Sequence, residues 1–158
     1  MLGTYYIFGG PVTPNDKYAF YWFKQSAEQD NAKGQYQLGY CYYSGTGTLV
    51  DYKQAVHWYK KSANQGYASA QFQLAICYHA GTGVNQNLTE SILWLTKAAT
   101  QGHSGAQFLL GSCYQTGDGV EENPQQAIYW FKKTLEHPEQ LDAEDISAMK
   151  KYIQEHDK

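Results

Sequence analysis

Three cysteines are the most reactive side chains in this 158-residue chain, each a possible nucleophile, metal ligand or disulfide partner. Cys41, Cys77 and Cys113 are spaced 36 residues apart. If that spacing reflects stacked, repeated helices, equivalent positions lie about 10 Å apart, whereas a disulfide needs Cα atoms within about 7 Å. We therefore expect three buried, unpaired thiols, which favours a reducing compartment such as the cytoplasm.

The other chemically active side chains form no catalytic or metal-binding pattern. Ser147 and Lys150 match the Ser-x-x-Lys string of penicillin-interacting enzymes, but the companion Ser-Asp-Asn and Lys-Thr-Gly segments are missing. Five histidines are present without a common spacing or a zinc-ligand pattern: His57, His79, His103, His137 and His156. We therefore expect no enzyme activity, no metal and no cofactor.

Aromatic side chains offer a different chemistry, the recognition of another polypeptide. Fifteen residues are tyrosine, whose rings combine a large apolar face with a hydroxyl group. Three of them, starting at residue 36, have the spacing i, i+4 and i+7 of one helix face. The equivalent positions 36 and 72 residues later carry other side chains. This predicted binding face consists of Lys33, Tyr36, Tyr40, Tyr43, Phe72, Ile76, His79, Phe108, Ser112 and Gln115.

The chemistry of this face changes along the chain. The first position of each stripe is aromatic in all three copies, which packing alone explains. The next two positions change from Tyr-Tyr to Ile-His to Ser-Gln, and equivalent packing sites do not require such variation. We predict a groove that is apolar at one end and polar at the other, with Tyr40 and Tyr43 as the binding hot spot. A surface without a special role is the alternative.

The helices and turns that hold these side chains follow a tandem repeat of 36 residues. All four tryptophans obey it, and so do three Gly-x-Gly turns at 45–47, 81–83 and 117–119. Within a repeat, apolar residues follow a helical period, with Asp51 a predicted helix start and Gly66 a predicted stop. Each repeat therefore consists of a first helix (helix A), a glycine turn, a second helix (helix B) and a short link.

The repeat predicts an all-α fold. We expect a right-handed α-α superhelix, or solenoid, in which the A helices line a concave groove and interfaces between repeats supply most of the stability. The first helix A is expected to be cut short, because Met1 aligns with Gln37. The array spans residues 1–137, with repeats at 1–31, 32–67, 68–103 and 104–137, followed by a C-terminal capping helix in 138–158.

Composition and charge exclude several other classes of protein. Hydrophobic residues make up 42% and charged residues 17%, which argues against a disordered chain. We find neither a signal peptide nor an apolar run of the roughly 18 residues that span a membrane. All 12 basic residues are lysine and the net charge is −3, so nothing indicates nucleic-acid binding. We expect a soluble, cytoplasmic monomer.

The segments 71–84 and 91–102 resemble the Sel1-like repeat, a relative of the tetratricopeptide repeat with a longer turn between its helices. The resemblance covers roughly residues 1–135. It implies a non-catalytic adaptor or scaffold that binds a peptide or a partner's helix in the concave groove.

Two alternatives to an adaptor stay open. One is a structural repeat segment of a larger multidomain protein. The other is a β-lactamase-like hydrolase, an activity linked with a disulfide-rich branch of Sel1-like proteins. That branch carries two cysteines in each repeat, whereas this chain carries one, so the hydrolase is the weaker interpretation.

Overall fold

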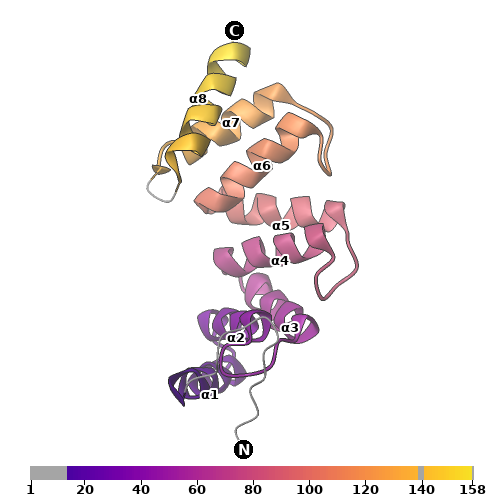
Figure 1. Ribbon diagram of the computed structural model, residues 1–158. Helices are drawn as coiled ribbons and strands as arrows, with labels where there is room; N and C mark the ends of the chain where they lie inside the picture. The colour runs from indigo at the N-terminus through magenta and orange to yellow at the C-terminus, as the bar shows by residue number, and fades with distance from the viewer. Residues whose placement is uncertain (1–13, 139–140, 158) are drawn as a thin grey trace, which may run out of the picture. The chain divides into compact units, whose positions relative to one another are not determined.

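The computed structural model describes residues 14–138 and 141–157, which form eight helices and no strand (Figure 1). The predicted all-α helical-repeat fold is confirmed. The shortened first helix A that the sequence predicts lies outside the described residues. The helices are α1 (Pro14–Glu28), α2 (Ala32–Ser44), α3 (Tyr52–Asn64), α4 (Ala68–Ala80), α5 (Leu88–Thr100), α6 (Ser104–Thr116), α7 (Pro124–Thr134) and α8 (Ala143–His156).

The chain forms two compact units, and each is described by itself. The N-terminal unit, Met1–Gln86, contains α1 to α4, and the C-terminal unit, Asn87–Lys158, contains α5 to α8. Within each unit every helix packs against the next one along the chain. In terms of the repeat, α2, α4 and α6 are A helices, whereas α1, α3, α5 and α7 are B helices.

Three of the B helices begin at a capping side chain, and the sequence predicts the one at Asp51. Asp51, Asn87 and Asn123 each accept a hydrogen bond from the backbone N–H three residues later, at 3.0 to 3.1 Å. These bonds satisfy N–H groups that the first helical turn leaves without a partner. The caps therefore fix where each Gly-x-Gly turn ends and the next helix starts.

The second glycine of each turn lies against the start of the preceding helix B. A Cβ atom on Gly83 would lie 2.2 Å from the carbonyl oxygen of Tyr52, and one on Gly47 would lie 2.3 Å from that of Asp16. Both glycines also have positive φ angles, +69° and +73°, which suit glycine best. The turn thus holds one repeat against the repeat before it.

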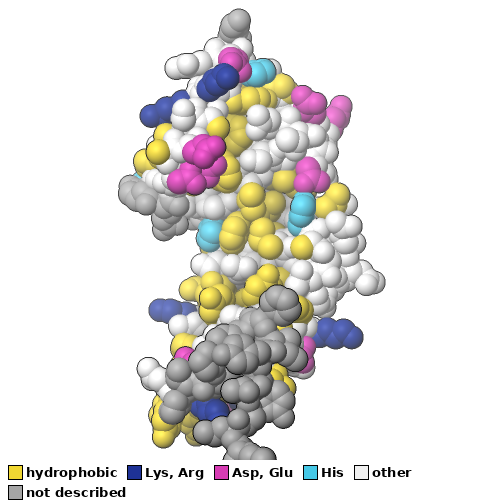
Figure 2. Space-filling view, viewed as in Figure 1, with side chains coloured by type: hydrophobic (Ala, Val, Ile, Leu, Met, Phe, Trp, Pro, Cys, Tyr) yellow, Lys and Arg dark blue, Asp and Glu magenta, His cyan; other side chains and the backbone are white. Residues whose placement is uncertain are grey.

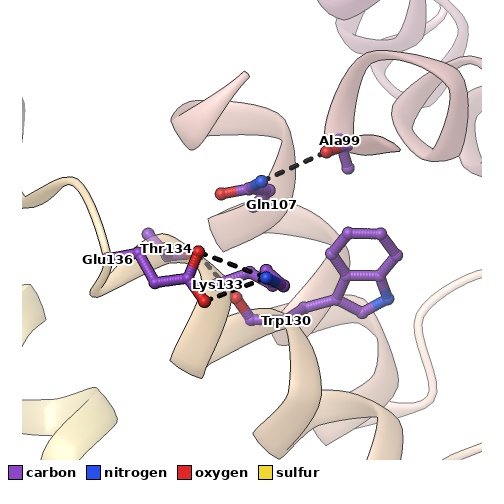
Figure 3. A network of polar contacts seen from close by, with 6 residues as sticks. All are labelled: Ala99, Gln107, Trp130, Lys133, Thr134 and Glu136. Carbon is purple, nitrogen blue, oxygen red and sulfur yellow. Dashed lines mark hydrogen bonds and ion pairs between the residues drawn. The ribbon is translucent and has the colours of Figure 1, made fainter. Parts of the chain in front are cut away.

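A buried glutamine in each helix A joins it to the preceding helix B, a feature that the sequence analysis missed. Gln35, Gln71 and Gln107 each donate from Nε2 to the carbonyl oxygen eight residues earlier, at 3.4, 3.2 and 3.1 Å. Figure 3 shows the bond from Gln107 to Ala99. These bonds satisfy carbonyl groups near the C-terminal end of helix B.

Glycine in two A helices makes room for an aromatic ring of helix B. A Cβ atom on Gly39 would lie 2.7 Å from a ring carbon of Tyr59, and one on Gly111 would lie 2.7 Å from a ring carbon of Phe131. Such contacts are too short for any carbon atoms. These glycines therefore let the helices approach until the ring lies directly on the partner backbone.

The last helix covers the end of the C-terminal unit, as predicted. Asp142 caps α8 by accepting a hydrogen bond from the N–H of Asp145 at 2.8 Å. Met149 is buried with Phe131, and the ring of Tyr152 meets the ring of Phe131 edge-on at 5.7 Å. Exposed acidic and basic side chains occupy the other side of α8, and Figure 2 shows acidic groups over this helix. The arrangement is that of a capping helix with a hydrated outer face.

Candidate binding surface

Three tyrosines of the predicted binding face lie on one side of α2. Tyr40 is the most accessible, with 50% of its surface exposed, whereas Tyr36 and Tyr43 are half-buried. The ring of Tyr36 lies 5.3 Å from that of Tyr67, and the ring of Tyr43 meets that of Tyr52 edge-on at 5.3 Å. The half-buried rings are thus held by aromatic neighbours, and Tyr40, which lies between them in the sequence of α2, is the exposed ring of the three.

A fourth tyrosine, Tyr59 of α3, is fully buried beneath these three. Its ring lies 5.9 Å from the ring of Tyr36. Among the described residues, nothing forms a hydrogen bond with the Tyr59 hydroxyl. Burial is the main reason that the pKa of Tyr59 is raised, and nearby Cys77, Tyr36, Tyr43 and Tyr40 add to the shift. The hydroxyl is therefore neutral near pH 7, and it has no acceptor among the described residues.

We call Tyr36, Tyr40, Tyr43 and Tyr59 the tyrosine cluster. The sequence analysis found the first three by their helical spacing and missed Tyr59. The equivalent residues in the other repeats are Phe23, Leu95 and Phe131. Because these are apolar, the sequence indicates an ordinary core position. The signal that could have found it is the hydroxyl group, which none of these three equivalents carries.

The other residues of the predicted binding face have mixed environments. In the N-terminal unit, Lys33 and His79 are exposed, whereas Phe72 and Ile76 are half-buried on α4. In the C-terminal unit, all three residues are partly buried on α6: the ring of Phe108 lies 6.3 Å from that of Phe131, Ser112 donates to the carbonyl oxygen of Phe108 at 3.1 Å, and Gln115 lies one turn further on. The structure therefore places the predicted residues on three A helices, seven in one unit and three in the other.

A polar cluster at the link between α1 and α2 replaces a glycine of the repeat. Asp30 has φ +61°, at the position where the next two repeats have Gly66 and Gly102. Its carboxylate accepts hydrogen bonds from Gln35 Nε2 at 2.9 Å and from Gln65 Nε2 at 3.3 Å. These bonds offset the strain of a left-handed residue that is not glycine. The cluster has a structural role.

The groups that could support catalysis or metal binding are dispersed. Ser147 and Lys150 are both exposed on α8. Within the described ranges, no three His, Cys, Asp or Glu side chains are grouped so that they could hold a metal ion. His103 instead caps α6, where its Nδ1 accepts a hydrogen bond from the N–H of Ala106 at 3.2 Å. No described helix is both long and apolar enough to cross a membrane.

All three cysteines are free and buried, as predicted. Burial raises the pKa of Cys41, Cys77 and Cys113 to about 11, from an ordinary value of 9.0. Because the thiolate is the reactive form, these thiols are unsuited to nucleophilic chemistry near neutral pH.

Because the three thiols are buried, we predict that the protein loses stability at alkaline pH. A thiol whose pKa is raised on folding stabilises the folded state fully below pH 9 and loses that contribution as the pH rises towards 11. We expect the free energy of unfolding to fall by about 1 kcal/mol per thiol between pH 9 and 10. Urea titrations at pH 8, 9 and 10 measure it. The triple alanine variant of the cysteines should show a flatter profile, and equal stability of the native chain at pH 8 and 10 would contradict the prediction.

The chain matches known proteins in both sequence and structure. The Sel1 repeat family matches residues 1–31, 32–67, 68–103 and 104–137. A Sel1 repeat protein from Oxalobacter formigenes is 30% identical with a TM-score of 0.79, over 90% of this chain and 59% of its own. Helicobacter pylori cysteine rich protein B is 18% identical with a TM-score of 0.67, over 89% of this chain and 98% of its own, which shows the fold alone. No curated protein sequence matches.

Repeated helix pairs, joined by glycine turns and buried glutamines, define a helical-repeat protein. The four matched repeats cover most of the chain, so this protein belongs to the Sel1 repeat family. Proteins of this family are helical-repeat proteins, and their typical role is protein-protein interaction. The chain spans 59% of the length of the Oxalobacter protein.

Proposed function

We propose that this chain is a non-catalytic interaction scaffold that binds a peptide or a helix of a partner protein on the predicted binding face. In the N-terminal unit the partner-binding surface is formed by α2 and α4, and its hot spot is the α2 surface around Tyr40. The N-terminal unit carries few basic residues, all of them lysine, so it offers no guanidinium group for a phosphate, which supports contact with a protein rather than with a nucleic acid.

The observation that carries this proposal is the exposed ring of Tyr40 between two anchored rings. Aromatic rings held by neighbours lose little conformational entropy when a partner binds. Tyr36 and Tyr43 are held in this way by Tyr67 and Tyr52. Tyrosine is also enriched at the few interface positions that carry most of the binding energy.

Alanine substitutions on α2 test the proposal. A peptide selected from a random display library against the native chain serves as the probe. We expect Tyr40→Ala and Tyr43→Ala to weaken its affinity at least tenfold, about 1.4 kcal/mol or more, with little change in melting temperature for Tyr40→Ala. Isothermal titration calorimetry and thermal unfolding are measured on the same samples.

Tyr129 supplies the matched control. It is also 50% exposed, but it lies on α7, a helix B. Tyr129→Ala should leave the affinity unchanged. If selected peptides bind both α2 variants as tightly as the native chain, the α2 surface is not the binding site.

A further inference from the structure

The A helices of the N-terminal unit carry almost no charge. The chain has 15 acidic and 12 basic residues, yet Lys33 is the only Asp, Glu, Lys or Arg in α2 and α4 together. The B helices of the same unit differ, because α1 and α3 contain seven such residues. The repeat therefore places its charges on one type of helix and leaves the other type nearly neutral.

Burial does not explain the missing charges. Half of the Tyr40 surface is exposed and His79 is also exposed, whereas Gln37 and Ile76 are half-buried. Charged side chains are the usual occupants of accessible helix positions. In the C-terminal unit, α6 contains no Asp, Glu, Lys or Arg at all, although acidic residues follow it directly in the turn. The neutrality is thus a property of the A helices and not of a single repeat.

The neutral surface of α2 and α4 has the composition of the centre of a protein interface. Such centres are depleted of charged residues and enriched in aromatic ones. The ring of Tyr67, which directly precedes α4, lies 5.3 Å from that of Tyr36 on α2, so the two helices present neighbouring aromatic groups. Lys33 lies in the first turn of α2, at one end of this surface. That is where the polar rim of an interface would lie.

The polar groups of this surface are neutral as well. Gln37 of α2 and Gln73 of α4 occupy equivalent positions, and both are half-buried. The hydroxyl of Ser44 already donates to the carbonyl oxygen of Tyr40 at 2.9 Å. Glutamine amides donate to and accept from uncharged groups such as peptide bonds. The surface therefore suits the polar groups of a neutral ligand, whereas a charged ligand would find Lys33 as the single permanently charged side chain.

We propose that the partner segment bound on α2 and α4 is uncharged and apolar over the length that contacts these helices. This inference rests on the proposed function, and it names the class of ligand. A charged side chain placed against the middle of this surface would lose its hydration without meeting an opposite charge. An apolar side chain there gains contact with the rings and has little hydration to lose. Charged residues of the partner lie outside the contact.

Two substitutions of opposite charge at Gln37 test the inference on the intact chain. The probe is a peptide selected from a random display library against the native chain, and isothermal titration calorimetry gives its affinity. Gln37 lies one turn before Tyr40 on the same face of α2. We expect Gln37→Glu and Gln37→Lys both to weaken the affinity about fivefold or more, because either charge must lose water beneath the ligand. The native affinity should change less than about twofold between roughly 50 and 500 mM salt.

Gln54 on α3 supplies the matched control. It is exposed on a helix B of the same unit, and the third repeat has Glu90 at the equivalent position. Gln54→Glu and Gln54→Lys should leave the affinity unchanged. Melting temperatures of all four variants, measured on the same samples, separate lost binding from lost folding.

Each other outcome of this experiment overturns a distinct statement. If one Gln37 variant binds more tightly and the other more weakly, the ligand carries a charge at this surface, so the inference is wrong and the proposed function stands. The same conclusion follows if both Gln37 variants bind as the native chain does while Tyr40→Ala weakens binding. If neither the Gln37 variants nor Tyr40→Ala and Tyr43→Ala change the affinity, both the inference and the proposed function are wrong.

Discussion

Replacing Gly83 with alanine is expected to destabilise the N-terminal unit by about 4 kcal/mol or more, a large fraction of the stability of a typical domain. The new Cβ atom would lie 2.2 Å from the carbonyl oxygen and 2.5 Å from the carbonyl carbon of Tyr52. Both are backbone atoms, so no side-chain rotation relieves the contact. Either the turn moves away from the start of α3 or α3 shifts, and each movement breaks the junction between successive repeats.

Gly66 separates this clash from the cost of backbone conformation. It also has a positive φ, +88°, but no atom outside its chain neighbours lies within 4 Å of the Cβ position. Gly66→Ala therefore carries only the strain of a left-handed alanine, about 1 kcal/mol. Circular dichroism and urea unfolding of the two variants give the comparison. Similar losses for Gly83→Ala and Gly66→Ala would mean that the turn does not hold the repeats together.

The fold was predictable because its signals are local and recur. A cap such as Asp51 and a stop such as Gly66 act within one helical turn, and the 36-residue spacing shows them again in later repeats. A polar side chain without a local role is harder to interpret. Gln35 reads as a surface residue of an amphipathic helix, yet it is buried because its amide bonds the end of the preceding helix.

The arrangement of the residues on the candidate surface was predictable only in part, for a physical reason. Helical spacing shows that Tyr36, Tyr40 and Tyr43 share one face, and the structure agrees. Whether the Tyr59 hydroxyl finds a partner depends on atoms from α2, α3 and α4 together, which spacing within one helix does not describe. The departure at Asp30 has the same origin, since its two glutamine partners come from α2 and from the end of α3.

Phe131→Ala is the second large effect, an expected loss of about 4 kcal/mol in the C-terminal unit. The ring is 2% exposed. It lies against Gly111 of α6 on one side and meets Tyr152 of α8 on the other. Its removal therefore leaves a cavity and loosens the capping helix. Unfolding monitored by urea titration gives the loss, and hydrogen exchange of the α8 amides should show that this helix opens first.

A second substitution shows whether Gly111 exists to make room for this ring. In the native background, Gly111→Ala would place a Cβ atom 2.7 Å from the ring of Phe131, and we expect a net loss of about 2 kcal/mol. In the Phe131→Ala background the same change meets a cavity, so alanine's better helix propensity and the added methyl should stabilise by about 1 kcal/mol. The sign of one substitution thus depends on the other residue, a coupling that a double-mutant cycle measures directly. Equal effects of Gly111→Ala in the two backgrounds would show that the glycine and the ring are independent.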